Sequence, residues 1–141
     1  MADLTFTASQ VLPDSTGTTV RGTAGATITA GQPLYLDSVT NTYKLADANA
    51  SALTAAAVGL ALHAALSGQP ITLQTGGSPT MGAGAAPTVG IVYVVSATAG
   101  GLAPAADLAS GHYTTIMGVG AASNKLKMPG AGPFASGQVL A

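Results

Sequence analysis

The stretch Gly31-Gln32-Pro33-Leu34-Tyr35-Leu36 predicts a β-strand that begins directly after a turn. Glycine suits the turn, proline is tolerated at the first residue of a strand, and leucine and tyrosine fit a pleated, half-buried surface. Residues 37–42 have the polar composition of a second turn, and Tyr43-Lys44-Leu45 returns as the partner strand. Together these runs predict a β-hairpin.

Short apolar runs separated by turns continue along the chain and predict a mainly β fold. Strands are expected near 33–37, 43–46, 57–62, 70–74, 90–96 and 113–120. Two interpretations compete between residues 47 and 66, because alanine favours a helix whereas Val58-Gly59-Leu60-Ala61-Leu62 resembles a buried strand. We expect a short helical turn near 48–55 followed by the strand at 57–62. The body should be a small β-barrel or a β-sandwich-like unit with short helical turns.

Composition divides the chain into three parts. Residues 1–22 are polar and rich in threonine, with too few apolar side chains to form a core. We expect them to be an extended N-terminal arm that pairs with the sheet of the body or with a neighbouring subunit. Residues 23–128 should form the β body, and residues 129–141, rich in glycine and proline, an extended C-terminal tail.

A loose internal repeat runs through the body. The series that contains Gly31, Tyr35 and Gly59 recurs around Tyr93 and Gly118, with tyrosine-to-glycine intervals of 24 and 25 residues. If the match reflects a duplication, the sub-repeats are 23–77 and 88–128. Four strands separated by turns also recur by chance in β proteins, so the pattern leaves both explanations open.

Charge and composition exclude several classes of protein. Only 6% of the residues are charged, against about 25% in an average soluble domain, and the formal net charge is −1. Without a basic surface we expect no binding to nucleic acid. The longest apolar stretch, 55–66, is much shorter than the ~20 residues that span a bilayer, so we expect no membrane partner. The chain has no cysteine, which excludes disulfides. So little charge predicts a surface covered by a partner or by further copies.

No motif predicts catalysis, a cofactor or a metal site. His63 and His112 lack the neighbouring cysteine or glutamate that would complete a zinc site. Asp107, Ser110 and His112 contain the residue types of a catalytic triad, but there is no G-x-S-x-G around a serine nucleophile. Residues 82–87 begin like a dinucleotide-binding loop and end in proline, without a surrounding βαβ unit. We therefore expect a protein that is not an enzyme and binds no small-molecule substrate.

The chain resembles the phage capsid decoration (cement) proteins, including the group of the lambda head decoration protein. The resemblance rests on four segments within roughly residues 23–128, each of them ordinary β sequence when taken alone. They are Ile28-Thr29-Ala30-Gly31-Gln32-Pro33-Leu34-Tyr35-Leu36, Tyr43-Lys44-Leu45-Ala46-Asp47-Ala48, Ala57-Val58-Gly59-Leu60-Ala61-Leu62 and Ser67-Gly68-Gln69-Pro70-Ile71-Thr72-Leu73.

This resemblance implies a homotrimer, made in the host cytoplasm, that sits on the outer surface of the virion capsid and clamps neighbouring major capsid proteins. Contacts are expected from the arm, through Leu4, Phe6, Val11, Leu12 and Arg21. Two other functions stay open: a structural module of a phage tail, fibre or baseplate, and a small β-barrel that binds a sugar or peptide. An aromatic content of 4% weakens the last.

Overall fold

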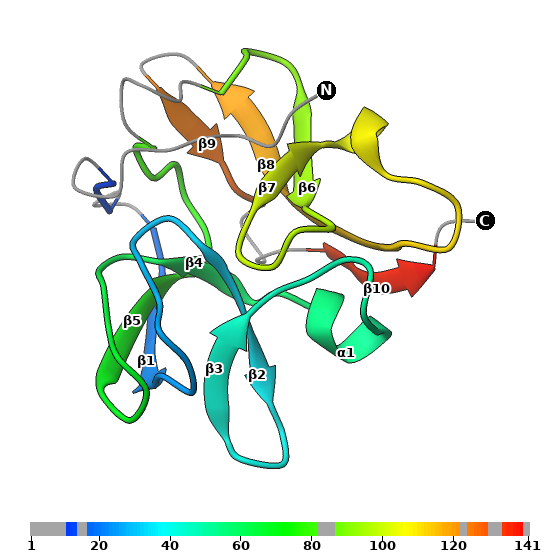
Figure 1. The fold of residues 1–141 in the computed structure, drawn as a ribbon. Helices are drawn as coiled ribbons and strands as arrows, with labels where there is room; N and C mark the ends of the chain where they lie inside the picture. Colours follow the sequence, from blue (N-terminus) through cyan, green and yellow to red (C-terminus); the bar gives the residue numbers. More distant parts are fainter. Residues whose placement is uncertain (1–10, 14–16, 82–86, 122–123, 130–133, 140–141) are drawn as a thin grey trace.

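Two antiparallel β-sheets make up the protein, one above the other in Figure 1. The computed structural model describes residues 11–13, 17–81, 87–121, 124–129 and 134–139. The first sheet contains, in spatial order, β1 (Thr19–Thr23), β5 (Pro70–Gln74), β4 (Gly59–Ala61), β2 (Pro33–Asp37) and β3 (Thr42–Leu45). The second contains β10 (Phe134–Val139), β8 (Tyr113–Ala121), β6 (Val92–Val95) and β7 (Leu102–Pro104), and β9 (Lys125–Lys127) pairs with β8.

The mainly β fold is confirmed. The strands expected at 33–37 and 70–74 have those bounds, and the other four expected strands differ by one or two residues at their ends. Neither sheet closes into a barrel. The first comes nearest to closure, because Ala24, directly after β1, forms a single parallel bridge with Tyr43 of β3.

Helical structure is confined to short turns in the described part of the chain. The helix α1 (Ala52–Ala55) lies within the helical turn expected at 48–55, and a 3-10 turn, η3 (Ala105–Asp107), follows β7. The hydroxyl of Ser51 accepts a hydrogen bond from the Thr54 N–H at 3.1 Å, and the hydroxyl of Thr54 accepts one from the Ser51 N–H at 3.0 Å. This reciprocal capping box explains where α1 begins. None of the described helices has the length and apolar character that a membrane crossing needs.

The two sheets share one pairing order. In the first, β2 pairs with β3 and β4, and β4 pairs with β5. In the second, β6 pairs with β7 and β8, and β8 pairs with β9. Residues 77–80 occupy the position that β1 has in the first sheet. Thr80 forms a bridge with Lys125 of β9, and Gly77 forms one with Met128, directly after β9.

The register is also shared. Adding 59 to the numbers of the paired residues Leu34 and Gly59 gives Tyr93 and Gly118, which are paired in the second sheet. The same shift relates the β2–β3 pairs to the β6–β7 pairs, from Leu34↔Leu45 and Tyr93↔Pro104 onward. The shift falls to 53 for β5 and β9, because the chain from Ala61 to its partner Leu73 is six residues longer than the chain from Gly120 to its partner Leu126.

We call residues 18–75 repeat 1 and residues 77–128 repeat 2, after the backbone hydrogen bonds that close each unit. The carbonyl of Thr18 accepts from the Thr75 N–H at 2.8 Å, and the carbonyl of Gly77 accepts from the Met128 N–H at 2.7 Å. These four residues are equivalent under the same two shifts. The equivalent ranges therefore differ from the 23–77 and 88–128 expected from the sequence.

Local details recur at the same positions. The side chain of Asp37 accepts a hydrogen bond from the Val39 N–H, and that of Ser96 accepts one from the Thr98 N–H, both at 3.0 Å. In the same hairpins, Asn41 has φ 56° and its equivalent Gly100 has φ 79°. Such agreement in turn chemistry goes beyond a shared strand order.

Gly59 of β4 and Gly118 of β8 are equivalent as well. A Cβ atom on Gly59 would lie 2.5 Å from the carbonyl oxygen of Gln74, and one on Gly118 would lie 2.5 Å from that of Lys127. Both positions therefore need glycine so that the next strand can approach. The internal repeat seen in the sequence matched these two glycines correctly. It matched Tyr35 to Tyr93, whereas the structure makes Leu34 the equivalent of Tyr93.

Two apolar clusters form the core. One lies within repeat 1 and contains Ala24, Ile28, Leu34, Tyr43, Ala61, Ala65, Ile71 and Leu73. The other joins the two repeats: it contains Ala46, Ala48, Ala57 and Leu60 of repeat 1 with Met81, Tyr93, Val95, Leu102, Met117, Leu126 and Met128 of repeat 2. We call this second cluster the seam. It fixes the two repeats against each other through side chains from both.

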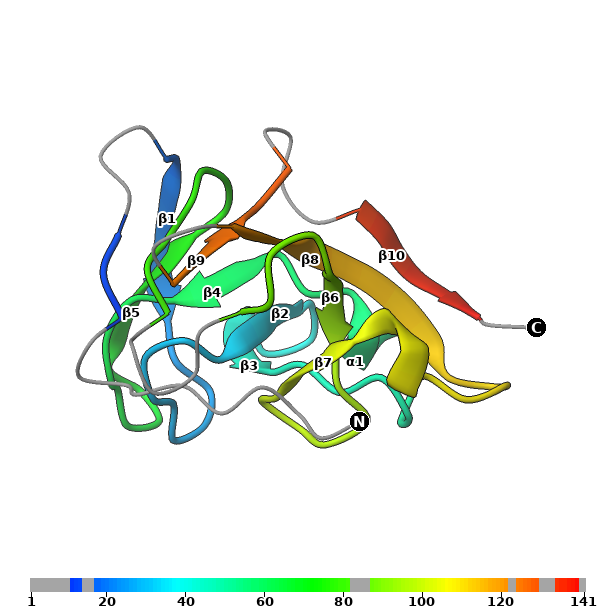
Figure 2. The same cartoon turned by 90° about the horizontal axis from the view of Figure 1, so that it is seen from above.

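The segments expected as arm and tail supply strands. β1 begins at Thr19 and pairs with β5, so it crosses the expected arm boundary at residue 22. Leu12 exchanges two backbone hydrogen bonds, both 3.0 Å, with Thr80 of repeat 2. β10, from the expected tail, runs antiparallel to β8, as Figure 2 shows. The described parts of the expected arm and tail thus pair with strands of the body.

Candidate interaction surface

An ion pair lies between the two strands of the β2–β3 hairpin. The Lys44 ammonium donates to a carboxylate oxygen of Asp37 at 2.7 Å across neighbouring strands. This bond, together with the Val39 N–H, lowers the pKa of Asp37 from 3.8 to about 2. The same contact raises the pKa of Lys44. The ion pair therefore joins the two strands of the hairpin.

The side chains of both histidines form hydrogen bonds with nearby backbone groups. His63 Nε2 accepts from the Thr72 N–H at 3.1 Å, so Nδ1 carries the proton that it donates to the Ala64 carbonyl at 2.9 Å. His112 Nδ1 accepts from the Ala109 N–H at 3.2 Å. Among the residues that the structure describes, no three histidine, cysteine, aspartate or glutamate side chains form a group that could hold a metal ion.

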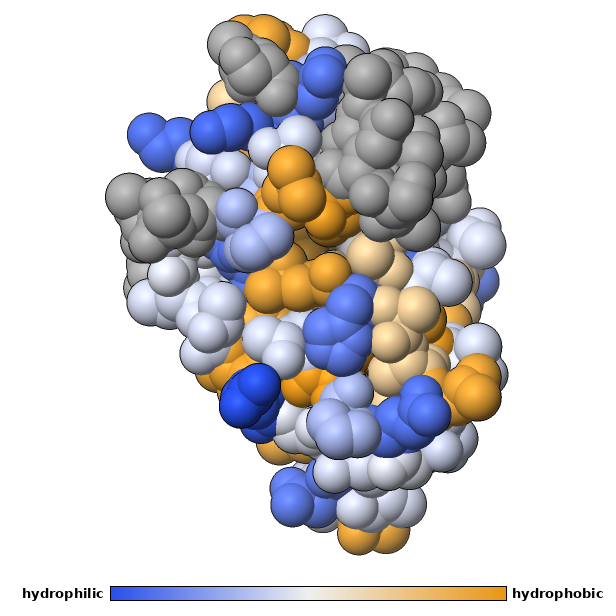
Figure 3. Space-filling model, turned by 90° about the vertical axis from the view of Figure 1, so that its left-hand side faces the viewer, coloured by the Kyte–Doolittle hydropathy of each residue, from blue (hydrophilic) through white to orange (hydrophobic). Residues whose placement is uncertain are grey.

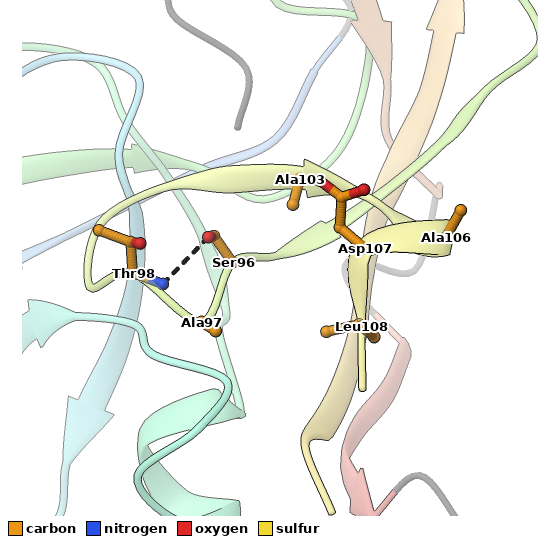
Figure 4. Close-up of a pocket in the computed structure, with 7 residues that line it drawn as sticks. All are labelled: Ser96, Ala97, Thr98, Ala103, Ala106, Asp107 and Leu108. Atoms are coloured by element: carbon orange, nitrogen blue, oxygen red, sulfur yellow. Dashed lines mark hydrogen bonds between the residues drawn. The ribbon is translucent and has the colours of Figure 1, made fainter. Parts of the chain in front are cut away.

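A polar hollow of about 370 Å³ lies between the β6–β7 turn and η3 (Figure 4). The residues that line it mostly have small side chains: they are Ser96, Ala97, Thr98, Ala103, Ala106, Asp107 and Leu108. The hydroxyl of Ser96 already accepts the Thr98 N–H, which holds the turn. Binding sites for small molecules are mostly lined by large apolar and aromatic side chains with a few converging polar groups. The hollow lacks that lining.

Large apolar side chains lie on the surface of this chain, which has only four basic and five acidic residues. Those exposed in the described residues are Leu12, Val20, Val39, Leu53, Val58, Leu66, Val89 and Val119. On the side where β1 and β5 lie, Figure 3 shows apolar atoms in an irregular band with polar side chains around it. Contiguous apolar surface of this kind is typical of sites that meet other proteins.

The contact residues expected from the arm have different positions. Leu12 is 57% exposed, and Arg21 is exposed on β1 opposite Thr72. Val11 is buried within the subunit, so its side chain is not available to a partner. Leu4 and Phe6 lie outside the described residues. The structure therefore leaves Leu12 and Arg21 as described members of the expected set that a partner can reach.

A second apolar surface was not expected from the sequence. Val92, Val119 and Lys127 lie side by side across β6, β8 and β9. They line a hollow of about 360 Å³ together with Ile116, Gly118, Met128 and Pro129. We call this surface the open face. Strand 113–120 was predicted, but which of its two sides stays uncovered depends on how the sheets pack, and the alternation of β8 alone does not show it.

Comparison with protein-family models and with curated proteins finds no match to this chain.

Proposed function

We propose that the chain is a structural decoration protein of a phage head, which binds the outer surface of the shell and bridges neighbouring major capsid proteins. The observation that carries the proposal is the surface: large apolar side chains are exposed on a nearly uncharged β body. The resemblance of residues 23–128 to capsid decoration proteins supports the same function. The protein acts by covering surface, and it needs no reacting group.

Open strand edges add a second means of contact. Among the described residues β3 pairs along its length with β2 alone, apart from the single bridge between Ala24 and Tyr43; β7 also ends its sheet, but its residues are buried. The unpaired N–H and C=O groups of an edge strand form hydrogen bonds with an extended segment of another chain. Backbone pairing of this kind, joined to apolar contact, suits a protein that seals the joints of a shell.

Several weak contacts are enough if copies act together. A trimer that touches three equivalent capsid sites gains an avidity of about 10²- to 10⁴-fold over a single contact. The assembled lattice presents those sites at once, whereas a free capsid subunit does not. A ligand that prefers one state stabilises it by about 2.7 kcal/mol per site at a concentration of about 100 times its Kd. Summed over a shell, this raises the temperature at which the head fails.

The test is to mix the purified protein with expanded heads that lack it. We expect the protein to co-sediment with heads and not with free capsid subunits. Decorated, DNA-filled heads should then release DNA at a higher temperature than undecorated ones. Coincident release curves at high occupancy would refute the proposal. Attachment to tails in electron micrographs, with bare heads, would favour the tail, fibre or baseplate function.

A further inference from the structure

The open face of repeat 2 has a counterpart in repeat 1. The shifts of 59 and 53 residues relate Pro33 to Val92, Leu60 to Val119 and Gln74 to Lys127. In each repeat the three residues are cross-strand neighbours on one side of the sheet. Two backbone surfaces of the same shape therefore exist in one chain.

The counterpart in repeat 1 is covered. Leu60 and Gln74 are both 0% exposed, and Pro33 is buried. Leu60 belongs to the seam, where it packs in the cluster that contains Tyr93 and Met117 of repeat 2. Leu60 is therefore covered by repeat 2, a unit of the same fold, whereas the Gln74 side chain lies against Gly17 and donates a hydrogen bond to the Gly76 carbonyl.

The open face has no such cover from described residues. Val119 is 38% exposed, Val92 is half-buried, and Lys127 is exposed where repeat 1 has the buried Gln74. A lysine keeps its ammonium in water while its aliphatic stem lies along apolar surface. The exchange of glutamine for lysine fits a contact that covers the two valines and leaves position 127 at its rim.

We infer that the open face is a self-association surface and that a second copy of this chain covers it. The chain itself shows the kind of partner that fits, because Leu60, the equivalent of Val119, is packed against a unit of this fold. With a net charge of −1, two copies repel each other little.

The contact joins unlike surfaces, as the seam does. Contacts of this type close into rings when the rotation between copies allows. The inference rests on the proposed function in one respect: it names the surface through which the copies of the proposed trimer meet.

The chain has no cysteine, so a single introduced thiol reports on one position. Val119→Cys places it on the open face, and Val39→Cys places it at a 90% exposed position in the β2–β3 turn as the matched control. Each variant is treated with a bulky maleimide across a range of protein concentrations, while sedimentation gives the mass. We expect the thiol at position 119 to react at least about tenfold more slowly in the oligomer than in the monomer, whereas the rate of the control thiol should be the same in both.

A rate at position 119 that is the same in the oligomer as in the monomer would overturn the inference. Protection that appears only when heads are added would assign the open face to the capsid protein: the inference would fail and the proposed function would stand. Self-association with protection, but without binding to heads, would support the inference and refute the proposed function.

A second pair of variants checks the same surface by charge. Val119→Lys should abolish self-association, because it adds a cation beside Lys127, whereas Val39→Lys should assemble like the wild type. Melting curves of both variants must show a folded monomer. Assembly of a folded Val119→Lys protein with unchanged affinity would also overturn the inference.

Discussion

Leu60 and Val119 are equivalent positions, but we predict that replacing them by alanine lowers the stability of the fold by very different amounts. Leu60 is fully buried in the seam, and its replacement by alanine leaves a cavity between the repeats. Such Leu→Ala changes cost about 2–5 kcal/mol, and we expect about 3 kcal/mol here. Val119 is 38% exposed, so Val119→Ala should cost less than about 1 kcal/mol in the monomer.

The assay is thermal and denaturant unfolding of the two variants, followed by circular dichroism. The protein must be dilute enough that association does not contribute to stability. A loss of about 3 kcal/mol corresponds to a decrease in Tm of roughly 10 °C for a chain of this size. Equal losses for Leu60→Ala and Val119→Ala would refute the assignment of one face as covered and the other as open. A loss below about 1 kcal/mol for Leu60→Ala would refute the seam.

Three further predictions concern charge and the arm. Asp37→Asn should lower Tm at pH 7, and its difference from the wild type should shrink progressively as the pH falls below about 4 and through about 2, because the folded pKa of Asp37 is about 2 against 3.8. A difference that is as large at pH 2 as at pH 7 would contradict the ion pair as its cause. Removal of residues 1–10, which contain Leu4 and Phe6 of the expected contact set, should weaken binding to heads in sedimentation. Removal of residues 1–22 should in addition lower Tm, because it truncates β1, and melting curves would show this. Binding to heads should change little between about 50 and 500 mM salt, since screening acts on exposed charges and this surface has few; a steep loss in that range would assign the contact to Arg21 or the lysines.

The strands that the sequence predicted are those that carry their own apolar residues. Residues 33–37 and 70–74 have apolar side chains and turn residues on both sides, and these local signals are sufficient. β1 was not predicted as a strand because Val20 is its single large apolar residue, and it exists because β5 offers an edge. β10 lies in a glycine- and proline-rich segment, and its pairing with β8 has no local signal.

The open face illustrates a similar limit. Val119 and Leu60 look alike in sequence, since each follows a glycine within an apolar strand. One is buried and the other exposed because repeat 2 covers repeat 1, while no described residue covers the outer side of repeat 2 in the same way. This asymmetry arises when two similar units pack in tandem. It becomes visible only when both registers are known.

Because the two repeats share one register, strands from different repeats could pair wrongly while the chain folds. β1 could pair with β9 in place of β5, since both edges have the same geometry. Arg21 is 51 residues from its native partner Thr72 and 104 residues from Lys125, which is equivalent to Thr72. Doubling a loop costs only about 0.6 kcal/mol in closure entropy, so chain length discriminates weakly between the two pairings.

Side chains provide the rest of the discrimination. In the native pairing each cation faces a threonine, Arg21 opposite Thr72 and Lys125 opposite Thr80. In the exchanged pairing Arg21 would lie directly opposite Lys125, and like charges at that position destabilise a sheet by up to about 1 kcal/mol. Two of the four basic residues of this nearly neutral chain therefore help to keep its two repeats from exchanging strands during folding.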